Sequence, residues 1–266
     1  MSKAIATLEN QGISAFKPKG TLADRFAAKI RDERAARQGG AGLWPTLKVS
    51  GAKFQFMEQN IGDSVRGIIL DVVNDHRYYD TGYTPGEVSP PACAAVGLDP
   101  DEMVPDPKGS DVQSTTTCSK CPLNAWGSST RKGSRGKACQ QRKRLTFLPW
   151  DGKSQLAKSE GARIIVPVTS GNNLALLGKL LEGVGRPLAY TLVDISVTSD
   201  PTNQYTMSFA PVTPINDPKL FAIIESKITE GQTSLMASPI FEASAAPKGK
   251  AKAGTKGRRT VVRSKA

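Results

Sequence analysis

The sequence has no long apolar run, and this absence excludes one class of protein at the outset. No stretch of about 18 apolar residues occurs among its 266 residues, so no transmembrane helix is predicted. The first 20 residues also lack the apolar segment of a secretory signal. Aromatic residues are scarce at 6%, whereas the hydrophobic content of 38% is ordinary for a folded domain. We therefore expect an intracellular, cytoplasmic protein with no membrane partner.

Acidic residues are missing from one end of the chain and outnumbered at the other. The formal net charge is +12. Residues 245–266 contain eight Lys or Arg and no Asp or Glu, and residues 1–40 contain eight against four. The intervening residues are balanced, so the excess positive charge lies in the two ends. A neutral body with basic ends favours a polyanionic partner such as nucleic acid, although basic ends can also serve solubility alone.

Composition divides the chain into three parts. Residues 1–42 form a basic arm in which Thr21 caps an amphipathic helix, and this helix either binds DNA or packs on the body. Residues 43–231 carry the strand and helix patterns of a folded core. Residues 232–266 end in a run of Ala, Gly, Lys, Arg and Ser that predicts a disordered basic tail.

The core reads as mainly β with added helices, that is, as an α+β domain. Strand patterns cover 64–80, 144–150, 162–170, 187–200 and 204–215, after a first one that includes Phe54 and Phe56. Amphipathic helices are predicted over 172–185 and 217–231. A long insertion without periodicity, at about 81–143, interrupts the strands. Such a layout fits an OB-like β-barrel with a loop insertion, while a β-sandwich or an open α+β sheet remains possible.

All four cysteines lie in this insertion. Cys93, Cys118, Cys121 and Cys139 are separated by 24, 2 and 17 residues. A reducing compartment disfavours disulfides, and one Cys-x-x-Cys knuckle with two further thiols suits tetrahedral Zn²⁺. An iron–sulfur cluster and free thiols remain alternatives. Four sulfur ligands would leave no open position, so the expected Zn²⁺ is structural. The single histidine, His76, could replace a cysteine, but its position at the end of a strand favours the protein surface.

The segment between Cys121 and Cys139 is rich in cations and glycine, and no acidic residue occurs from 112 to 150. Lys and Arg neutralise phosphates, and aromatic faces stack on bases. Considered alone, Trp126 is slightly better explained as packing over the metal site than as stacking on a base. At the strand end, we expect one of Tyr78 and Tyr79 to face the core and the other to face a ligand. The candidates for nucleic-acid contact are Arg66, Arg77, Tyr78, Tyr79, Tyr83, Trp126, Arg131, Lys132, Arg135, Lys137, Arg142, Lys143 and Arg144.

The layout resembles the zinc-containing, OB-fold single-stranded DNA-binding proteins of phages. The residues that carry the resemblance are the strand 64–73 and the segments CAAVGLDPDE at 93–102, CSKCPLNAWGS at 118–128, GKAC at 136–139 and RLTFLPW at 144–150. It implies largely sequence-independent binding of single-stranded DNA, or of RNA, in replication, recombination or repair, inside a bacterial host cell if the chain is phage-encoded. It also implies replication or recombination proteins as partners. Many such proteins end in an acidic recruiting tail, whereas this chain ends in a basic one.

Two other functions are compatible with the sequence. A zinc-stapled adaptor would bind duplex DNA or RNA polymerase in transcription or replication. An iron–sulfur nuclease would need carboxylates for Mg²⁺, and the candidates near a strand are Asp71, Asp75 and Asp80, for which no convincing partner is found. We therefore expect no catalytic residues and no enzymatic activity.

Overall fold

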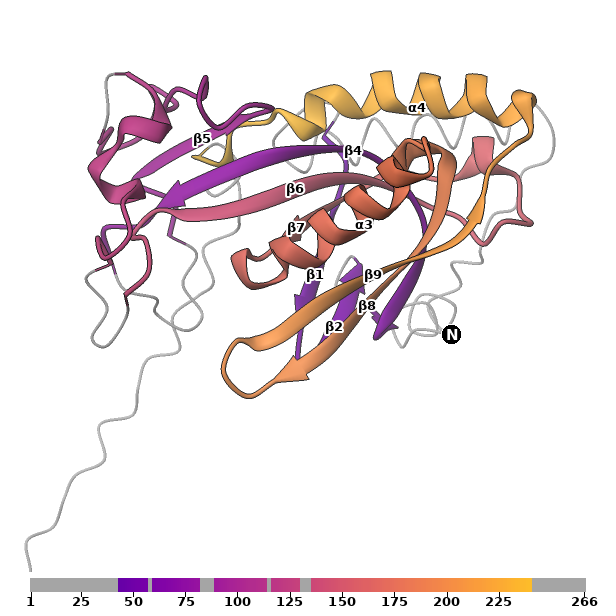
Figure 1. The fold of residues 1–266 in the computed structure, drawn as a ribbon, viewed down its shortest axis with the longest axis horizontal. Helices are drawn as coiled ribbons and strands as arrows, with labels where there is room; N and C mark the ends of the chain where they lie inside the picture. Colours follow the sequence, from indigo (N-terminus) through magenta and orange to yellow (C-terminus); the bar gives the residue numbers. More distant parts are fainter. Residues whose placement is uncertain (1–42, 57–58, 82–88, 114–115, 130–134, 241–266) are drawn as a thin grey trace, which may run out of the picture.

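The computed structural model describes residues 43–56, 59–81, 89–113, 116–129 and 135–240, so the predicted N-terminal arm and residues 241–266 lie outside it. Within the described residues, nine strands form one curled sheet, and the α-helices α3 (Gly171–Gly183) and α4 (Pro218–Leu235) pack against it (Figure 1). The strand order is β3-β2-β1-β7-β6-β4-β8-β9, with β5 paired to β4 beside this path. The strands are β1 (Thr46–Ser50), β2 (Lys53–Phe56), β3 (Gln59–Gly62), β4 (Ser64–Tyr78), β5 (Cys93–Gly97), β6 (Gln140–Pro149), β7 (Ala162–Val166), β8 (Thr191–Asp200) and β9 (Gln204–Pro214).

The 15-residue strand β4 organises the sheet. Along one edge, its residues Gly67 to Arg77 pair with β6. Along the other edge, its first part pairs with β8, and its last part, from Asn74 to Tyr78, pairs with β5. A register shift between Ile69 and Asp71 marks a β-bulge, which locally bends and twists a strand. Beyond this bulge, β4 and β6 extend away from the curled part of the sheet toward β5 and the insertion (Figure 1).

Both faces of the sheet carry a hydrophobic core, which explains why β4 reads as nearly continuous apolar sequence. Successive side chains on a strand point to opposite faces. Ile69 therefore packs in the core that contains Leu177 of α3, and its neighbour Ile68 packs in the core that contains Ile224 of α4. The two helices cover opposite faces of the same strand.

The curled part contains, in chain order, the strands β4, β6, β7, β8 and β9. Strand β4 pairs antiparallel with β6 on one edge and with β8 on the other. Strand β6 then pairs with β7, and β8 pairs with β9. Helix α3 connects β7 to β8. The far edge of β7 is taken by β1, which runs parallel to it. The sheet therefore curls into a half-barrel with edges at β3 and β9.

The prediction of a mainly β, α+β domain is confirmed, and so are most of the individual elements. Asp217 caps α4 as predicted, since its Oδ1 accepts a hydrogen bond from the Lys219 N–H at 2.9 Å. The first strand pattern is in fact a hairpin: Gly51 and Ala52, both with positive φ, turn the chain between β1 and β2.

Two of the predictions about the elements were wrong, namely a missed strand and the start of the tail. Strand β5 lies inside the insertion, where no strand was predicted, because five residues with little alternation pair with the end of β4. The tail was predicted to begin at residue 232, but α4 continues to Leu235, and both Ser234 and Leu235 are buried. Packing against the sheet stabilises this polar final turn, and a composition-based boundary does not detect such packing.

A buried ionic network ties the end of α4 to the sheet. Asp75 of β4 is fully buried and accepts hydrogen bonds from Arg77, at 2.7 Å to each oxygen, and from Arg144 of β6, at 3.0 and 3.2 Å. Arg144 also donates to the carbonyl oxygens of Leu235 and Ala237 at 3.0 and 2.5 Å. Burial alone would raise the pKa of Asp75, but the hydrogen bond from Arg77 and the charges of the neighbouring arginines lower it from 3.8 to about 2.

We expect Asp75→Asn to lower the free energy of unfolding by about 3–5 kcal/mol at pH 7, because it leaves buried guanidinium groups without their counter-charge. The folded-state pKa of Asp75 is lowered, so its contribution is complete above pH about 4 and is lost as the pH falls toward 2. Urea unfolding at several pH values measures this. The control is Asp194→Asn, whose partner Arg66 is 47% exposed and which should change stability much less. Equal effects of the two substitutions at pH 7 would contradict the prediction.

Candidate functional site

The four cysteines meet where the insertion folds back on the end of the sheet. Cys93, the first residue of β5, pairs with Tyr78 of β4. Cys139 immediately precedes β6, whose first residue, Gln140, pairs with Arg77. These two cysteines therefore lie on the strands that flank the end of β4.

The other two cysteines belong to a pair of short 3-10 turns, η1 (Cys118–Lys120) and η2 (Pro122–Asn124), which we call the knuckle. Within it, the Cys121 N–H donates to the Cys118 carbonyl at 3.3 Å, and the Asn124 side chain donates to the same carbonyl at 3.0 Å. The Cys139 N–H donates to the carbonyl of Leu123 at 2.9 Å. Backbone hydrogen bonds thus hold the knuckle against the sheet end.

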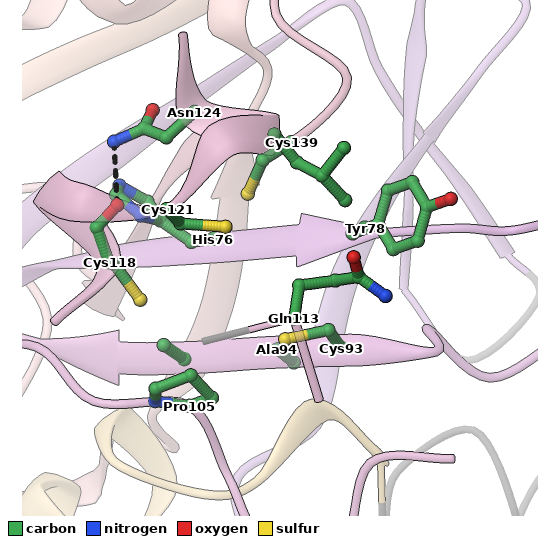
Figure 2. Close-up of a pocket in the computed structure, with 12 residues that line it drawn as sticks. His76, Tyr78, Cys93, Ala94, Pro105, Gln113, Cys118, Cys121, Asn124 and Cys139 are labelled. Carbon is green, nitrogen blue, oxygen red and sulfur yellow. Dashed lines mark hydrogen bonds between the residues drawn. The ribbon is translucent and has the colours of Figure 1, made fainter. Parts of the chain in front are cut away.

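All four cysteines line a single pocket, and Figure 2 shows their sulfur atoms pointing toward it. None of them is in a disulfide. Burial raises the pKa of Cys118 to about 11 and that of Cys139 to about 12, and it also raises the pKa of Cys93. In the part of the chain that the structure describes, no three His, Cys, Asp or Glu side chains are arranged so that they could already hold a metal ion. The pocket thus presents four convergent thiols that would have to close around an ion and release their protons to solvent as they bind it.

His76 belongs to the same pocket, contrary to the prediction that it lies at the surface. It is only 2% exposed, and it sits on β4 between Ala95 of β5 and Gln141 of β6. Gln141 donates to Asn124 of the knuckle at 2.8 Å, so the knuckle covers this row of the sheet. Burial lowers the pKa of His76 to about 4, with a further contribution from Lys143, so the imidazole is neutral near pH 7. The sequence pattern did not show that the insertion covers the strand end.

Trp126 lies on the outside of the insertion. It is 80% exposed, which contradicts the expectation that it packs over the metal site. The ammonium group of Lys137 lies 5.5 Å from the centroid of its ring and also donates to Asn124 and Gln141, at 3.2 and 3.0 Å. Next to Trp126, Gly127 has a φ of +84° and its N–H donates to the carbonyl oxygens of Arg135 and Gly136. This turn brings the backbone of Arg135, whose side chain is exposed, next to the residue that follows Trp126.

The remaining predicted contacts divide by their burial. Arg144 is fully buried beneath α4, and this contradicts its prediction as a nucleic-acid contact. Arg142 and Lys143 are partly buried; burial lowers the pKa of each, and they donate to Tyr79 and Asn74 respectively. The cationic run at 142–144 was treated as one surface, but it is part of β6, so its side chains point to both faces of a covered sheet.

Other candidates are engaged or outside the described residues. Arg66 pairs with Asp194 through two hydrogen bonds of 2.6 and 2.7 Å, and Arg77 pairs with Asp75. Tyr78 and Tyr79 are half-buried, and Tyr78 lines the cysteine pocket. Tyr83, Arg131 and Lys132 lie outside the described residues. An exposed aromatic ring and a positive charge therefore coincide at Trp126 and Lys137, and the exposed Arg135 belongs to the same loop.

Comparison of the chain with protein-family models, with curated proteins and with solved structures gives no match. Across the described residues, no helix has both the length and the apolar character needed to span a bilayer. The function is therefore inferred from two local features, namely the cysteine pocket and the exposed loop between Cys121 and Cys139.

In metal-free protein we expect Cys118 and Cys139 to react slowly with iodoacetamide. A thiol with a pKa of about 11 has about a hundredth of the thiolate of a thiol with a pKa of 9.0, and the thiolate is the nucleophile. Mass spectrometry of each cysteine-containing peptide against time, at pH 7.5, measures the rates. Guanidinium-unfolded protein is the control, in which the four rates should converge. Rates for Cys118 and Cys139 that equal those of the unfolded chain would contradict the prediction.

Proposed function

We propose that this protein binds single-stranded nucleic acid, with little dependence on sequence, through the loop between Cys121 and Cys139, and that a structural Zn²⁺ holds this loop in place. The observation that carries the proposal is the 80% exposure of Trp126 with the Lys137 ammonium group over its ring. The exposed face of a large aromatic side chain is well suited to stack on an unpaired base. Arg135 and Lys137 supply positive charge for the neighbouring phosphates.

The strand order supports an OB-like barrel as the core. In an OB-fold, five strands form a partly open barrel, and oligonucleotides bind on strands 2 and 3 and on the loops that join strands 1–2 and 4–5. Here β4, β6, β7, β8 and β9 would be strands 1 to 5. The insertion then corresponds to the loop between strands 1 and 2, and the turn between Asp200 and Gln204 to the loop between strands 4 and 5. The exposed Trp126 therefore occupies a loop that OB-folds use for binding.

The donor set of the pocket fits Zn²⁺. Cys93, Cys118, Cys121 and Cys139 would hold it, and soft thiolate sulfur is a preferred ligand of this ion. Four protein ligands leave no position for a reacting water, so the ion would serve the fold. When bound, it would join the segments that carry Cys93, Cys118 with Cys121, and Cys139, and the binding free energy would become folding free energy.

The proposal extends to the biological setting that the sequence resemblance implies. The protein would cover single-stranded DNA, or RNA, during replication, recombination or repair, in the cytoplasm of a bacterial host if it is phage-encoded, and without catalysing a reaction. One of the nuclease candidates is already engaged: Asp75 is buried and held by two arginines, so it is not available to a Mg²⁺ ion.

We expect tight binding of a fluorescein-labelled single-stranded oligonucleotide, much weaker binding of the matching duplex, and a steep loss of affinity with salt. Trp126→Ala should cost about 1–3 kcal/mol, which is about a 5- to 150-fold rise in Kd. Leu98→Ala is the matched control, because Leu98 is 71% exposed and follows β5 at the end opposite to Cys93. Equal affinity for single strand and duplex would instead favour a duplex-binding adaptor. An unchanged Kd for Trp126→Ala would remove the proposed stacking site.

We also expect purified protein to contain one zinc ion per chain, measured by atomic emission. Removing it with a chelator should lower hydrogen-exchange protection in β5 and the knuckle, while β8 and β9 remain protected by the sheet. Cys121→Ser should reproduce this loss, and Ser119→Ala, within the same knuckle, should not. Iron in place of zinc, with absorbance in the visible, would contradict the proposed metal and would call for a nuclease assay.

A further inference from the structure

The imidazole of His76 is a buried polar group whose role the proposed function does not explain. Its Nδ1 atom is inaccessible to solvent and has no hydrogen-bond partner among the described residues. A buried polar atom without a partner is costly, of the order of one hydrogen bond or more, and native proteins contain few of them. An unpaired atom in this position indicates that a partner belongs there.

The polar side chains around His76 are already engaged with one another. Gln141, its neighbour on β6, bonds to Asn124 and Lys137. Asn74, two residues earlier on the same face of β4, donates to the Leu98 carbonyl and accepts from Lys143. The other polar side chains that line this pocket are Tyr78, Gln113 and the four cysteine thiols. The four sulfur atoms are therefore the largest group of candidate acceptors for an Nδ1–H donor.

The chemistry of a four-thiolate centre creates a need for such a donor. Four thiolates around one Zn²⁺ carry a net charge of −2, which is unfavourable in a pocket buried between the knuckle and the sheet. Donors in the surrounding shell spread this charge onto N–H groups and orient the ligands. A neutral imidazole can place its one proton on Nδ1 and donate it to a neighbouring acceptor.

We propose that Nδ1–H of His76 donates a hydrogen bond to a metal-bound thiolate of the cysteine pocket, and that His76 is therefore a positioning residue rather than a fifth ligand. The four cysteines already complete a tetrahedral set, so the imidazole lies outside it. This inference rests on the proposed metal site, and it adds a residue from near the end of β4 to a site otherwise made by the insertion.

The experiment compares His76→Leu, which removes the donor but keeps an apolar side chain in the pocket, with His76→Asn, whose side-chain N–H can approximate Nδ1–H. Zn²⁺ affinity is measured by competition with a chromophoric chelator. The ligand set is read from the visible spectrum of the Co²⁺-substituted protein, and the stability of metal-free protein from its thermal midpoint. Single-stranded oligonucleotide binding is measured on the same samples.

We expect His76→Leu to bind one Zn²⁺ with an affinity about 10- to 100-fold lower, while the Co²⁺ spectrum keeps its all-sulfur form. His76→Asn should recover much of this loss. The metal-free His76→Leu protein should be at least as stable as metal-free wild type, because an unpaired polar group has been removed. A residue with only a packing role would not lower metal affinity while leaving the metal-free protein intact.

Two results would overturn the inference alone. A changed Co²⁺ spectrum in His76→Leu would make His76 a ligand, and an unchanged Zn²⁺ affinity would show that it does not serve the metal. A wild-type protein that binds neither Zn²⁺ nor Co²⁺ would overturn the metal site itself, and this inference with it. Oligonucleotide binding by that protein would then show whether the proposed nucleic-acid function survives without the metal.

Discussion

The structure depends on one strand, β4, and on the hydrogen bonds that it makes along both edges. Its first part lies between β6 and β8 and closes the curled half of the sheet, and its last part lies between β6 and β5 and supports the insertion. Because adjacent residues on a strand face opposite sides, its end serves two environments at once. Asp75 points into the ionic network under α4, and its neighbour His76 points into the cysteine pocket.

This arrangement links the C-terminal end of the described chain to the proposed site. Arg144 bonds Asp75 and the last carbonyl groups of α4, so residues 235–237 are held beside the strands that carry the insertion.

The proposed metal site and the proposed binding loop are parts of one short segment. Cys121 and Cys139 bracket Trp126 and Arg135, and the Asn124 side chain contacts both the knuckle backbone and Lys137. Closing the four thiols around an ion would therefore restrict the conformations of the loop that presents Trp126. Such ordering before a ligand arrives reduces the conformational entropy that binding would otherwise cost.

The sequence by itself determined the class of the fold, most of the strands and both described helices, because alternation in segments such as 204–214 and caps such as Asp217 are local signals. It also predicted a metal site from the spacing of four cysteines, and the structure brings these cysteines to one pocket. Tertiary structure alone decided burial: Arg142, Lys143 and Arg144 look alike in sequence, yet Arg144 is enclosed by α4 while Arg135 is exposed. For the same reason, His76 was predicted at the surface but is buried, and Trp126 was predicted to pack over the metal site but is exposed. Whether a side chain is exposed to water depends on which distant segment covers it. Here the knuckle and the last turn of α4 cover the end of β4. Both segments are 40 to 160 residues away from β4 in the sequence.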